Sequence, residues 1–379
     1  MGTSRRRFLG LTAAAVGSAA AGITPAAAAE ARELPDRPEA RRSVGTLYLA
    51  TYTSSAGGGT GIGLATYDGT TGAITSAGTL TGVQDPSFLV MASSGRFLYA
   101  VNEQSSGGVT AVAVDAPGRL RVLNRQPNGG SGPCHLALVA NGKYLLSANY
   151  GSGDVAVHPV KADGSLGART DLVKHVGATP HAHQVVQDPT GKYILAVDLG
   201  TDSVYTSTLS AAGKLTQKSQ AKLATGAGPR HLAFHPNGQY AYVANEVDST
   251  ITVCRYDGTS GKLTPGASRS TVPAGSPTNY PGEVIVSPDG RFVYLTNRGH
   301  NSVAIFAVEA AGASLRLMAT PSCGGNWPRH CTLDPTGTLL FVSNQKSNNL
   351  TTFHVDVQTG ALTPAADFTA PIPVCVLPG

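Results

Sequence analysis

Residues 133–149, Pro-Cys-His-Leu-Ala-Leu-Val-Ala-Asn-Gly-Lys-Tyr-Leu-Leu-Ser-Ala-Asn, contain the unit that decides the fold. A proline opens a short apolar strand, a Gly turn follows, and a second apolar strand ends in Asn. The unit recurs from residues 86, 133, 181, 229, 281 and 328, with His181 in place of the proline in one copy. These starts lie 47 to 52 residues apart, a period typical of four-stranded blades. We therefore predict an all-β fold, a β-propeller.

The two ends of the chain complete one further blade. Residues 46–51 match the second strand of the unit, residues 61–67 match a third strand, and residues 373–377 match a first strand. Pairing of the N- and C-terminal strands would close the ring and leave no open sheet edge. Six or eight blades, or a solenoid, are alternatives, but the fragments favour a seven-bladed propeller with four-stranded blades.

The first residues have the pattern of an export signal. Residues 4–9 read Ser-Arg-Arg-Arg-Phe-Leu, a weakly apolar run follows, and small residues fill positions 26–29. This pattern predicts a cleaved signal of the twin-arginine type at 1–29, a lead-in at 30–44 and the propeller at 45–379. A Sec signal is the main alternative. The apolar run is too short and too rich in Ala and Gly for a membrane anchor, so we expect an exported protein, secreted or periplasmic.

Charge and cysteine content exclude several classes of function. Removing residues 1–29 takes away three arginines and no acid, which lowers the net charge from +5 to +2. A net charge this small does not indicate a nucleic-acid partner. The five cysteines are odd in number and form no C-x-x-C pair, so neither a disulfide framework nor a zinc site is indicated, although one bridge involving Cys323 stays open. We expect no metal and no cofactor.

Equivalent positions of the repeat differ in how uniform they are. The second strand ends in a short polar residue in all seven copies, which predicts a role in the fold through hydrogen bonds at a turn; the residues are Thr51, Asn102, Asn149, Asp198, Asn245, Asn297 and Asn344. The next position varies and is therefore free to carry chemistry; it holds Tyr52, Glu103, Tyr150, Leu199, Glu246, Arg298 and Gln345.

The start of the first strand also varies between copies. Its third residue is Phe88, His135, His183, His231, Glu283, His330 or Cys375, and the residue before it includes Arg230 and Arg329. Because antiparallel strands place these starts beside the ends of the second strands, we expect both sets around one mouth of the central channel. His135 and His330 could instead bridge blades, and Arg329 could pair with a carboxylate.

An irregular cluster from His181 to His300 stands out from the repeat. Arginine offers a rigid fork for carboxylate or phosphate, and a nearby glutamate or histidine can move a proton or orient water. The sequence has no G-x-S-x-G elbow, P-loop or dinucleotide fingerprint. The cluster predicts a pocket for a small anionic molecule.

The chain resembles the seven-bladed β-propeller lactonase family, which includes the YbhE-type 6-phosphogluconolactonases and the fungal carboxy-muconate lactonizing enzymes. The motifs that carry the resemblance are residues 148–153, 180–183, 228–231, 244–246, 287–292 and 297–300. The resemblance implies lactone hydrolysis or the reverse ring closure. The similarity to the fungal branch also implies a catalytic set of Arg230, Arg298, Glu246 and one of His181 and His183.

Our hypothesis is direct, metal-independent opening of a small, anionic, sugar-type lactone by water. Arg230 and Arg298 would hold an anionic group and stabilise the oxyanion, while Glu246, His181 or His183 would take the proton. The remaining candidates are assigned to substrate binding: His135, Tyr150, His231, Glu283, His300, Arg329 and His330. We expect a monomer. A non-catalytic ligand- or protein-binding propeller and a muconate-lactonizing cycloisomerase are the alternatives. Because export conflicts with a cytosolic phosphorylated substrate, we favour a sugar lactone without phosphate.

Overall fold

The computed structural model describes residues 44–116 and 118–379. The predicted signal at 1–29 and nearly all of the predicted lead-in lie outside these residues. Residue 44, which we had assigned to the lead-in, is the first residue of strand β1 (Val44–Thr51).

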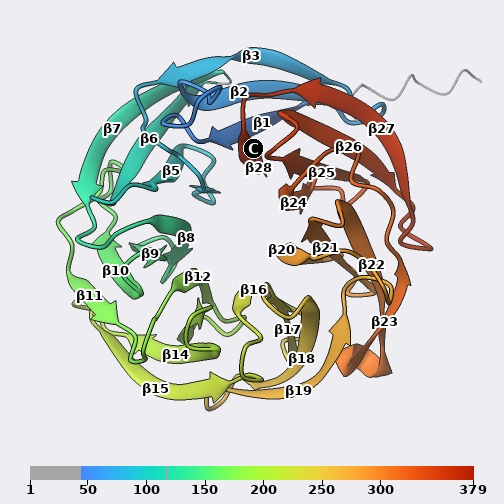
Figure 1. Ribbon diagram of the computed structural model, residues 1–379. Helices are drawn as coiled ribbons and strands as arrows, with labels where there is room; N and C mark the ends of the chain where they lie inside the picture. Colours follow the sequence, from blue (N-terminus) through green and yellow to red (C-terminus); the bar gives the residue numbers. More distant parts are fainter. Residues whose placement is uncertain (1–43, 117) are drawn as a thin grey trace, which may run out of the picture. The chain divides into compact units, whose positions relative to one another are not determined.

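Seven four-stranded antiparallel sheets surround a central axis (Figure 1). Blade 1 contains β28 (Pro373–Pro378), β1, β2 (Gly61–Asp68) and β3 (Ile74–Thr81), in that order from the axis outward. Blades 2 to 4 follow along the chain: β4 (Leu89–Met91), β5 (Phe97–Asn102), β6 (Gly108–Ala116) and β7 (Arg119–Pro127); β8 (Pro133–Val139), β9 (Tyr144–Asn149), β10 (Asp154–Pro159) and β11 (Asp171–Lys174); β12 (Ala182–Gln187), β13 (Tyr193–Asp198), β14 (Ser203–Leu209) and β15 (Leu215–Lys222).

Blades 5 to 7 repeat the same order: β16 (Pro229–Phe234), β17 (Tyr240–Asn245), β18 (Thr250–Asp257) and β19 (Lys262–Ser270); β20 (Tyr280–Val286), β21 (Phe292–Arg298), β22 (Ser302–Glu309) and β23 (Ser314–Ala319); β24 (Pro328–Leu333), β25 (Leu339–Asn344), β26 (Asn349–Val355) and β27 (Leu362–Thr369). A three-residue 3-10 turn, Ala310–Gly312, precedes β23. No helix within the described ranges is long and apolar enough to cross a membrane.

The ring closes by pairing the two ends of the chain. Strand β28 pairs antiparallel with β1, with Leu377 opposite Tyr48, so blade 1 is built from both termini. The prediction of a seven-bladed all-β propeller closed in this way is confirmed.

The apolar core is divided among the blade interfaces. Seven clusters of buried residues each join two neighbouring blades, as Leu195 of blade 4 and Val243 of blade 5 do. Face-to-face packing of this kind buries the large side chains between sheets. The fold therefore draws its apolar stabilisation from between the blades, and the axis can accommodate polar residues.

The short polar residue that ends each second strand serves the fold, in agreement with its uniformity. Asn297 is fully buried and donates from Nδ2 to the Thr271 carbonyl at 2.9 Å. Asp198 accepts hydrogen bonds from the backbone N–H groups of His181 and Thr201, each at 2.9 Å. These side chains fix the loops at one face of the disc, and this is the face that holds the candidate site.

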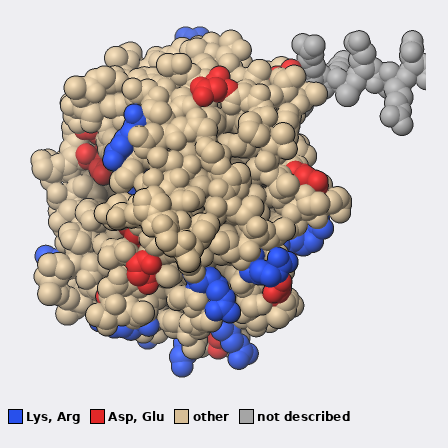
Figure 2. All heavy atoms as spheres, turned by 45° about the vertical axis from the view of Figure 1, so that its right-hand side comes forward, with Lys and Arg blue, Asp and Glu red and all other residues tan. Residues whose placement is uncertain are grey.

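The surface carries scattered charges. Figure 2 shows acidic and basic side chains interspersed over one face, with wide uncharged areas between them. All five cysteines are buried and unpaired, so the bridge that the sequence left open at Cys323 is not formed.

Candidate functional site

One residue from each inner strand or its approach contributes to a layer that crosses the channel, here called the axial layer. Its members are Phe88, His135, His183, His231, Glu283, His330 and Cys375. The Phe88 ring lies 4.1 Å from the His135 ring and 5.7 Å from the His330 ring, and the His135 ring lies 5.2 Å from that of His231 (centroid distances). Because these contacts join non-adjacent blades 3 and 5, the layer closes across the axis.

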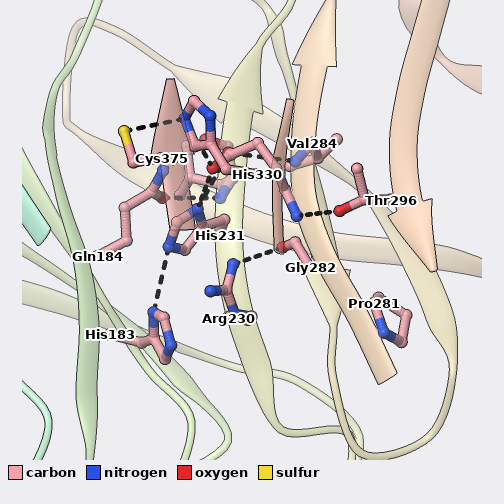
Figure 3. A network of polar contacts seen from close by, with 12 residues as sticks. His183, Gln184, Arg230, His231, Pro281, Gly282, Val284, Thr296, His330 and Cys375 are labelled. Atoms are coloured by element: carbon pink, nitrogen blue, oxygen red, sulfur yellow. Dashed lines mark hydrogen bonds and ion pairs between the residues drawn. The ribbon is translucent and has the colours of Figure 1, made fainter. Parts of the chain in front are cut away.

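Three members of the axial layer form a hydrogen-bonded chain (Figure 3). His183 Nδ1 lies 3.1 Å from His231 Nε2. His231 Nδ1 lies 3.0 Å from both carboxyl oxygens of Glu283. The Val284 N–H donates to Glu283 at 3.2 Å, and His330 Nε2 lies 3.6 Å from the same carboxyl group. Glu283, His231 and His183 are here called the relay.

Burial keeps the relay histidines neutral. Burial, reinforced by the charge of Arg230, lowers the pKa of both His183 and His231 well below the usual value. A carboxylate can only accept a hydrogen bond, so the Nδ1 of His231 donates to Glu283 and its Nε2 accepts. His183 must then donate from Nδ1, which leaves a lone pair on its Nε2.

The Nε2 of His183 is in contact with solvent, although the residue as a whole is only 5% exposed. It makes no hydrogen bond with a residue of the described ranges, and it is not among their buried unpaired polar atoms. The structure thus presents a neutral imidazole nitrogen with access to solvent, which is linked through His231 to a carboxylate. This geometry suits a general base.

A second set of charged side chains, here called the mouth layer, comprises Tyr52, Glu103, Arg230, Glu246, Arg298 and Arg329. Glu246 Oε2 lies 2.6 Å from Arg298 Nη2 and 3.3 Å from Arg230 Nε. Burial raises the pKa of Glu246, but Arg298 and Arg230 outweigh it, so the pKa lies below its usual value. Glu246 is therefore an ionised partner of two arginines and a weak proton acceptor.

Backbone carbonyls of blade 6 orient the same two arginines. Arg230 Nη1 donates to the Gly282 carbonyl at 2.7 Å, and Arg298 donates to the Tyr280 and Pro281 carbonyls, each at 3.0 Å. Gly282 is required here, because a Cβ would lie 2.5 Å from Thr296 Oγ1. Burial, followed by repulsion from Arg298 and Arg329, lowers the pKa of Arg230 to about 9, so it is still charged at neutral pH.

Each of these arginines keeps a free donor. Arg230 Nη2 and Arg298 Nη1 make no hydrogen bond within the described part of the chain, and neither is a buried unpaired atom. Fixed N–H donors of this kind can stabilise negative charge that develops in a transition state.

The two histidines of residues 181–183 occupy different places. His183 belongs to the buried axial layer, whereas the His181 ring stacks on that of Tyr150 with centroids 4.4 Å apart. His181 Nδ1 also donates to the Tyr150 carbonyl at 2.8 Å. Tyr150 is 36% exposed, so this pair forms part of the rim.

Two other candidates make fewer polar contacts. His300 Nδ1 lies 2.8 Å from the Ser302 hydroxyl, and no hydrogen bond, ion pair or ring contact joins it to either layer within the described ranges. The Nδ1 of His135 is buried without a partner, and burial lowers the pKa of this ring well below its usual value. His135 thus packs as a neutral ring in the axial layer.

The sequence reasoning missed Trp327. Its φ of 65° lies in the left-handed region, which a bulky residue rarely adopts. The Lys346 ammonium lies 3.3 Å from the centre of the indole, and the Arg298 guanidinium and the Tyr280 ring lie 5.7 and 5.8 Å from it. Trp327 is the one tryptophan of the chain and directly precedes Pro328, which was the available signal.

A metal centre is not evident from the side chains. Residues 44–116 and 118–379 contain no group of three His, Cys, Asp or Glu side chains arranged to hold an ion. The histidines of the axial layer instead contact each other and Glu283.

The sequence and structure of the chain are similar to those of known proteins. The 6-phosphogluconolactonase of Bacillus subtilis is 37% identical over 340 residues, which cover 87% of this chain and 97% of that protein. A crystal structure of a Lactobacillus plantarum protein superimposes with a TM-score of 0.84 at 34% identity, covering 89% of this chain and 99% of the other. The periplasmic gluconolactonase of Pseudomonas aeruginosa gives 0.83 at 30% identity, with coverage of 89% and 99%. Residues 46–378 match the family described as lactonase, 7-bladed beta-propeller, and the chain belongs to that family.

Proposed function

We propose that this lactonase opens sugar-type lactones by direct attack of water, with His183 as the general base. The observation that carries the proposal is the relay, which leaves a lone pair on His183 Nε2 beside two arginines with free donors. Between Glu246 and the histidine pair, the geometry favours His183. Glu246 is tied to two arginines, and His181 lies at the rim.

The reaction follows from the placement of these groups. A water molecule transfers a proton to His183 Nε2 while its oxygen bonds to the lactone carbonyl carbon. The free N–H groups of Arg230 and Arg298 stabilise the oxyanion. The bond from that carbon to the ring oxygen then breaks, and the proton moves from His183 to the leaving oxygen. The product is the open hydroxy acid.

The relay supports the proton transfer. When His183 gains a proton, its Nδ1 proton can shift toward His231 Nε2, and the positive charge then lies next to Glu283. The Glu283 carboxylate stabilises that charge while it still accepts the hydrogen bond from His231 Nδ1. The carboxylate of a hydrolytic triad acts in the same way.

We also propose that the protein acts after export through the twin-arginine route, with residues 1–29 removed. The paired arginines before Phe8 and the A-x-A exit support this. The likeness to a periplasmic gluconolactonase agrees with it. A lactone without phosphate is then the favoured physiological substrate.

The experiment is a hydrolysis screen of the purified protein over 6-phosphogluconolactone, glucono-δ-lactone and simple γ-lactones, with and without a chelator. We expect turnover of sugar lactones at rates that the chelator does not change. No turnover across the panel would support a binding propeller instead, and loss of activity with chelator would overturn direct hydrolysis. Supplying an open muconate and observing lactone would support the cycloisomerase alternative.

A further inference from the structure

We propose that Arg329 is the specificity-determining residue of this site and binds a carboxylate or phosphate that the lactone carries away from its ester. The proposal rests on the function proposed above. It reassigns the anionic group of the substrate, which the sequence reasoning had placed on Arg230 and Arg298.

Arg329 lacks the partners that the other two arginines have. Its side chain is only 15% exposed, yet its nearest carboxyl oxygen, Glu103 Oε2, lies 3.9 Å from its Nη2. It makes no hydrogen bond with any residue of the described ranges, whereas Arg230 and Arg298 donate to three backbone carbonyls and share Glu246. Within the described ranges, Arg329 is thus the arginine of the mouth layer whose side chain makes no hydrogen bond through any of its donors.

The donors of Arg329 are partly accessible to solvent. None of the Arg329 nitrogens is among the buried unpaired atoms, so they reach space that a ligand or water can enter. A guanidinium carries five N–H donors in a rigid fork that fits carboxylate or phosphate through two parallel hydrogen bonds. Leaving such a group largely buried without acceptors is costly, and an anionic ligand would remove that cost.

The surroundings hold Arg329 in place without satisfying it. Its guanidinium lies 5.8 Å from the centre of the Tyr52 ring, at a distance suited to a cation–π contact. The Tyr52 hydroxyl donates to Glu103 Oε2 at 3.0 Å, which engages the oxygen nearest to Arg329. Tyr52, Glu103 and Arg329 come from blades 1, 2 and 7 and hold one another across the mouth.

Arg329 lies in the blade next to one that supplies residues of the proposed reaction site. It lies at the start of β24 in blade 7, beside blade 6, which supplies Arg298 (Figure 1). Its charge also contributes to the lowered pKa of His183 and of Glu246, so it belongs to the same electrostatic site as the relay. A lactone whose ester meets His183 would extend its other end across the mouth toward Arg329.

The test compares three lactones of similar size: glucono-δ-lactone, which is neutral; a glucarolactone, which carries a carboxylate; and 6-phosphogluconolactone, which carries a phosphate. For R329Q we expect the ratio of kcat/KM on a charged lactone to kcat/KM on the neutral lactone to fall by about 10- to 100-fold, from the loss of hydrogen bonds to a charged group. If the ratio falls only with the glucarolactone, the ligand of Arg329 is a carboxylate. If it falls only with 6-phosphogluconolactone, the ligand is a phosphate.

R329K retains the charge but not the fork and should recover part of the ratio. The control is R316Q, because Arg316 is 59% exposed and pairs with Glu309 on the surface, and its ratio should equal that of the wild type. An unchanged ratio in folded R329Q on both charged lactones would overturn the proposal. Wild-type protein inactive on all three lactones would instead refute the proposed function, which separates the two failures.

Calorimetry with the open acids provides a readout that needs no turnover. We expect the wild type to bind glucarate or 6-phosphogluconate more tightly than gluconate and R329Q to lose that preference. Equal binding of the three acids by the wild type would also overturn the proposal.

Discussion

Replacing Glu283 with Gln removes the negative charge of the relay while keeping its size and shape. The amide oxygen of Gln can still accept from His231 Nδ1, so the ring position is retained. What is lost is the charge that stabilises a protonated His231 or His183. E283Q therefore tests whether the relay acts electrostatically in catalysis or only fills the axis.

The magnitude follows from the distances. Unit charges about 4 Å apart interact by about 4 kcal/mol at an effective dielectric of about 20. Both carboxyl oxygens lie 3.0 Å from His231 Nδ1, the His183 ring lies one imidazole further at 5.0 Å from the His231 ring, and the Glu283 side chain is only 8% exposed. Because the charge is only partly developed in the transition state and lies partly on the more distant ring, we expect about half of that energy, or about a 30-fold loss in kcat/KM.

The assay is the initial rate of glucono-δ-lactone hydrolysis across pH, corrected for spontaneous opening. Loss of the carboxylate lowers the pKa of the neighbouring histidines further, so the acid limb of kcat/KM should move to lower pH in E283Q while the plateau falls. A merely structural role would lower the amount of folded enzyme without moving that limb. H231Q should lower kcat/KM by at least as much as E283Q. The double variant E283Q/H231Q should lose less than the product of the two single fold-losses, because the two residues act together.

E309Q is the matched control, because Glu309 is exposed and pairs with Arg316; it should match the wild type. If folded E283Q retains kcat/KM within about two-fold of the wild type and the same pH profile, the relay does not take part in the reaction, and the assignment of His183 as the base loses its support.

Three further outcomes follow from the same contacts. H183Q should lower kcat/KM at least about 10-fold more than H181Q on the same lactone, because general bases contribute about 100-fold or more and His181 lies at the rim; equal losses would argue against the split of the pair. E246Q leaves Arg230 and Arg298 without their shared carboxylate and should lower the free energy of unfolding by about 1–3 kcal/mol, less than for a fully buried pair because Glu246 is 23% exposed. A urea unfolding curve identical to that of the wild type would contradict this. The pKa values of four axial-layer histidines lie below those in the unfolded chain: His135, His183, His231 and His330. Below about pH 6.5 the unfolded chain therefore binds more protons than the folded protein, and each of these histidines should lower the free energy of unfolding by up to about 1.4 kcal/mol per pH unit. A melting temperature that stays constant from pH 7 to pH 5 would contradict this.

The repeat made the fold and much of the site predictable from sequence. A period near one blade length, with complementary fragments at the ends, determined the number of blades because every interface needs the same apolar pattern. The same alignment indicated that Arg230, Glu246 and Arg298 would meet, since strand starts and strand ends share one face. Glu246 and Arg298 lie 52 residues apart, yet their ion pair follows from equivalent positions in neighbouring blades.

What the repeat could not show depends on single residues. The alignment placed His183 at the third position of its strand and His181 at the proline position, but it could not show which of the two is the candidate base. That follows from single contacts, the hydrogen bond of His183 with His231 and that of His181 with the Tyr150 carbonyl. Trp327 escaped notice because no other blade has a tryptophan to compare. The unequal pairing of the three arginines depends on where each fork finds a carbonyl, which no periodicity contains.

The irregular cluster from His181 to His300 has a physical reason in the way this fold is stabilised. The apolar clusters lie between the blades, and the charged residues at the inner-strand starts of blades 5 and 6, Arg230 and Glu283, are not among their members. Blades 4, 5 and 6 supply the relay and Arg230, Glu246 and Arg298, whereas blades 1, 2 and 7 supply Tyr52, Glu103 and Arg329. The reaction and the recognition of charge would then occupy neighbouring arcs of one mouth, and substitutions in one arc should change substrate preference with less effect on the proton transfer carried out by the other.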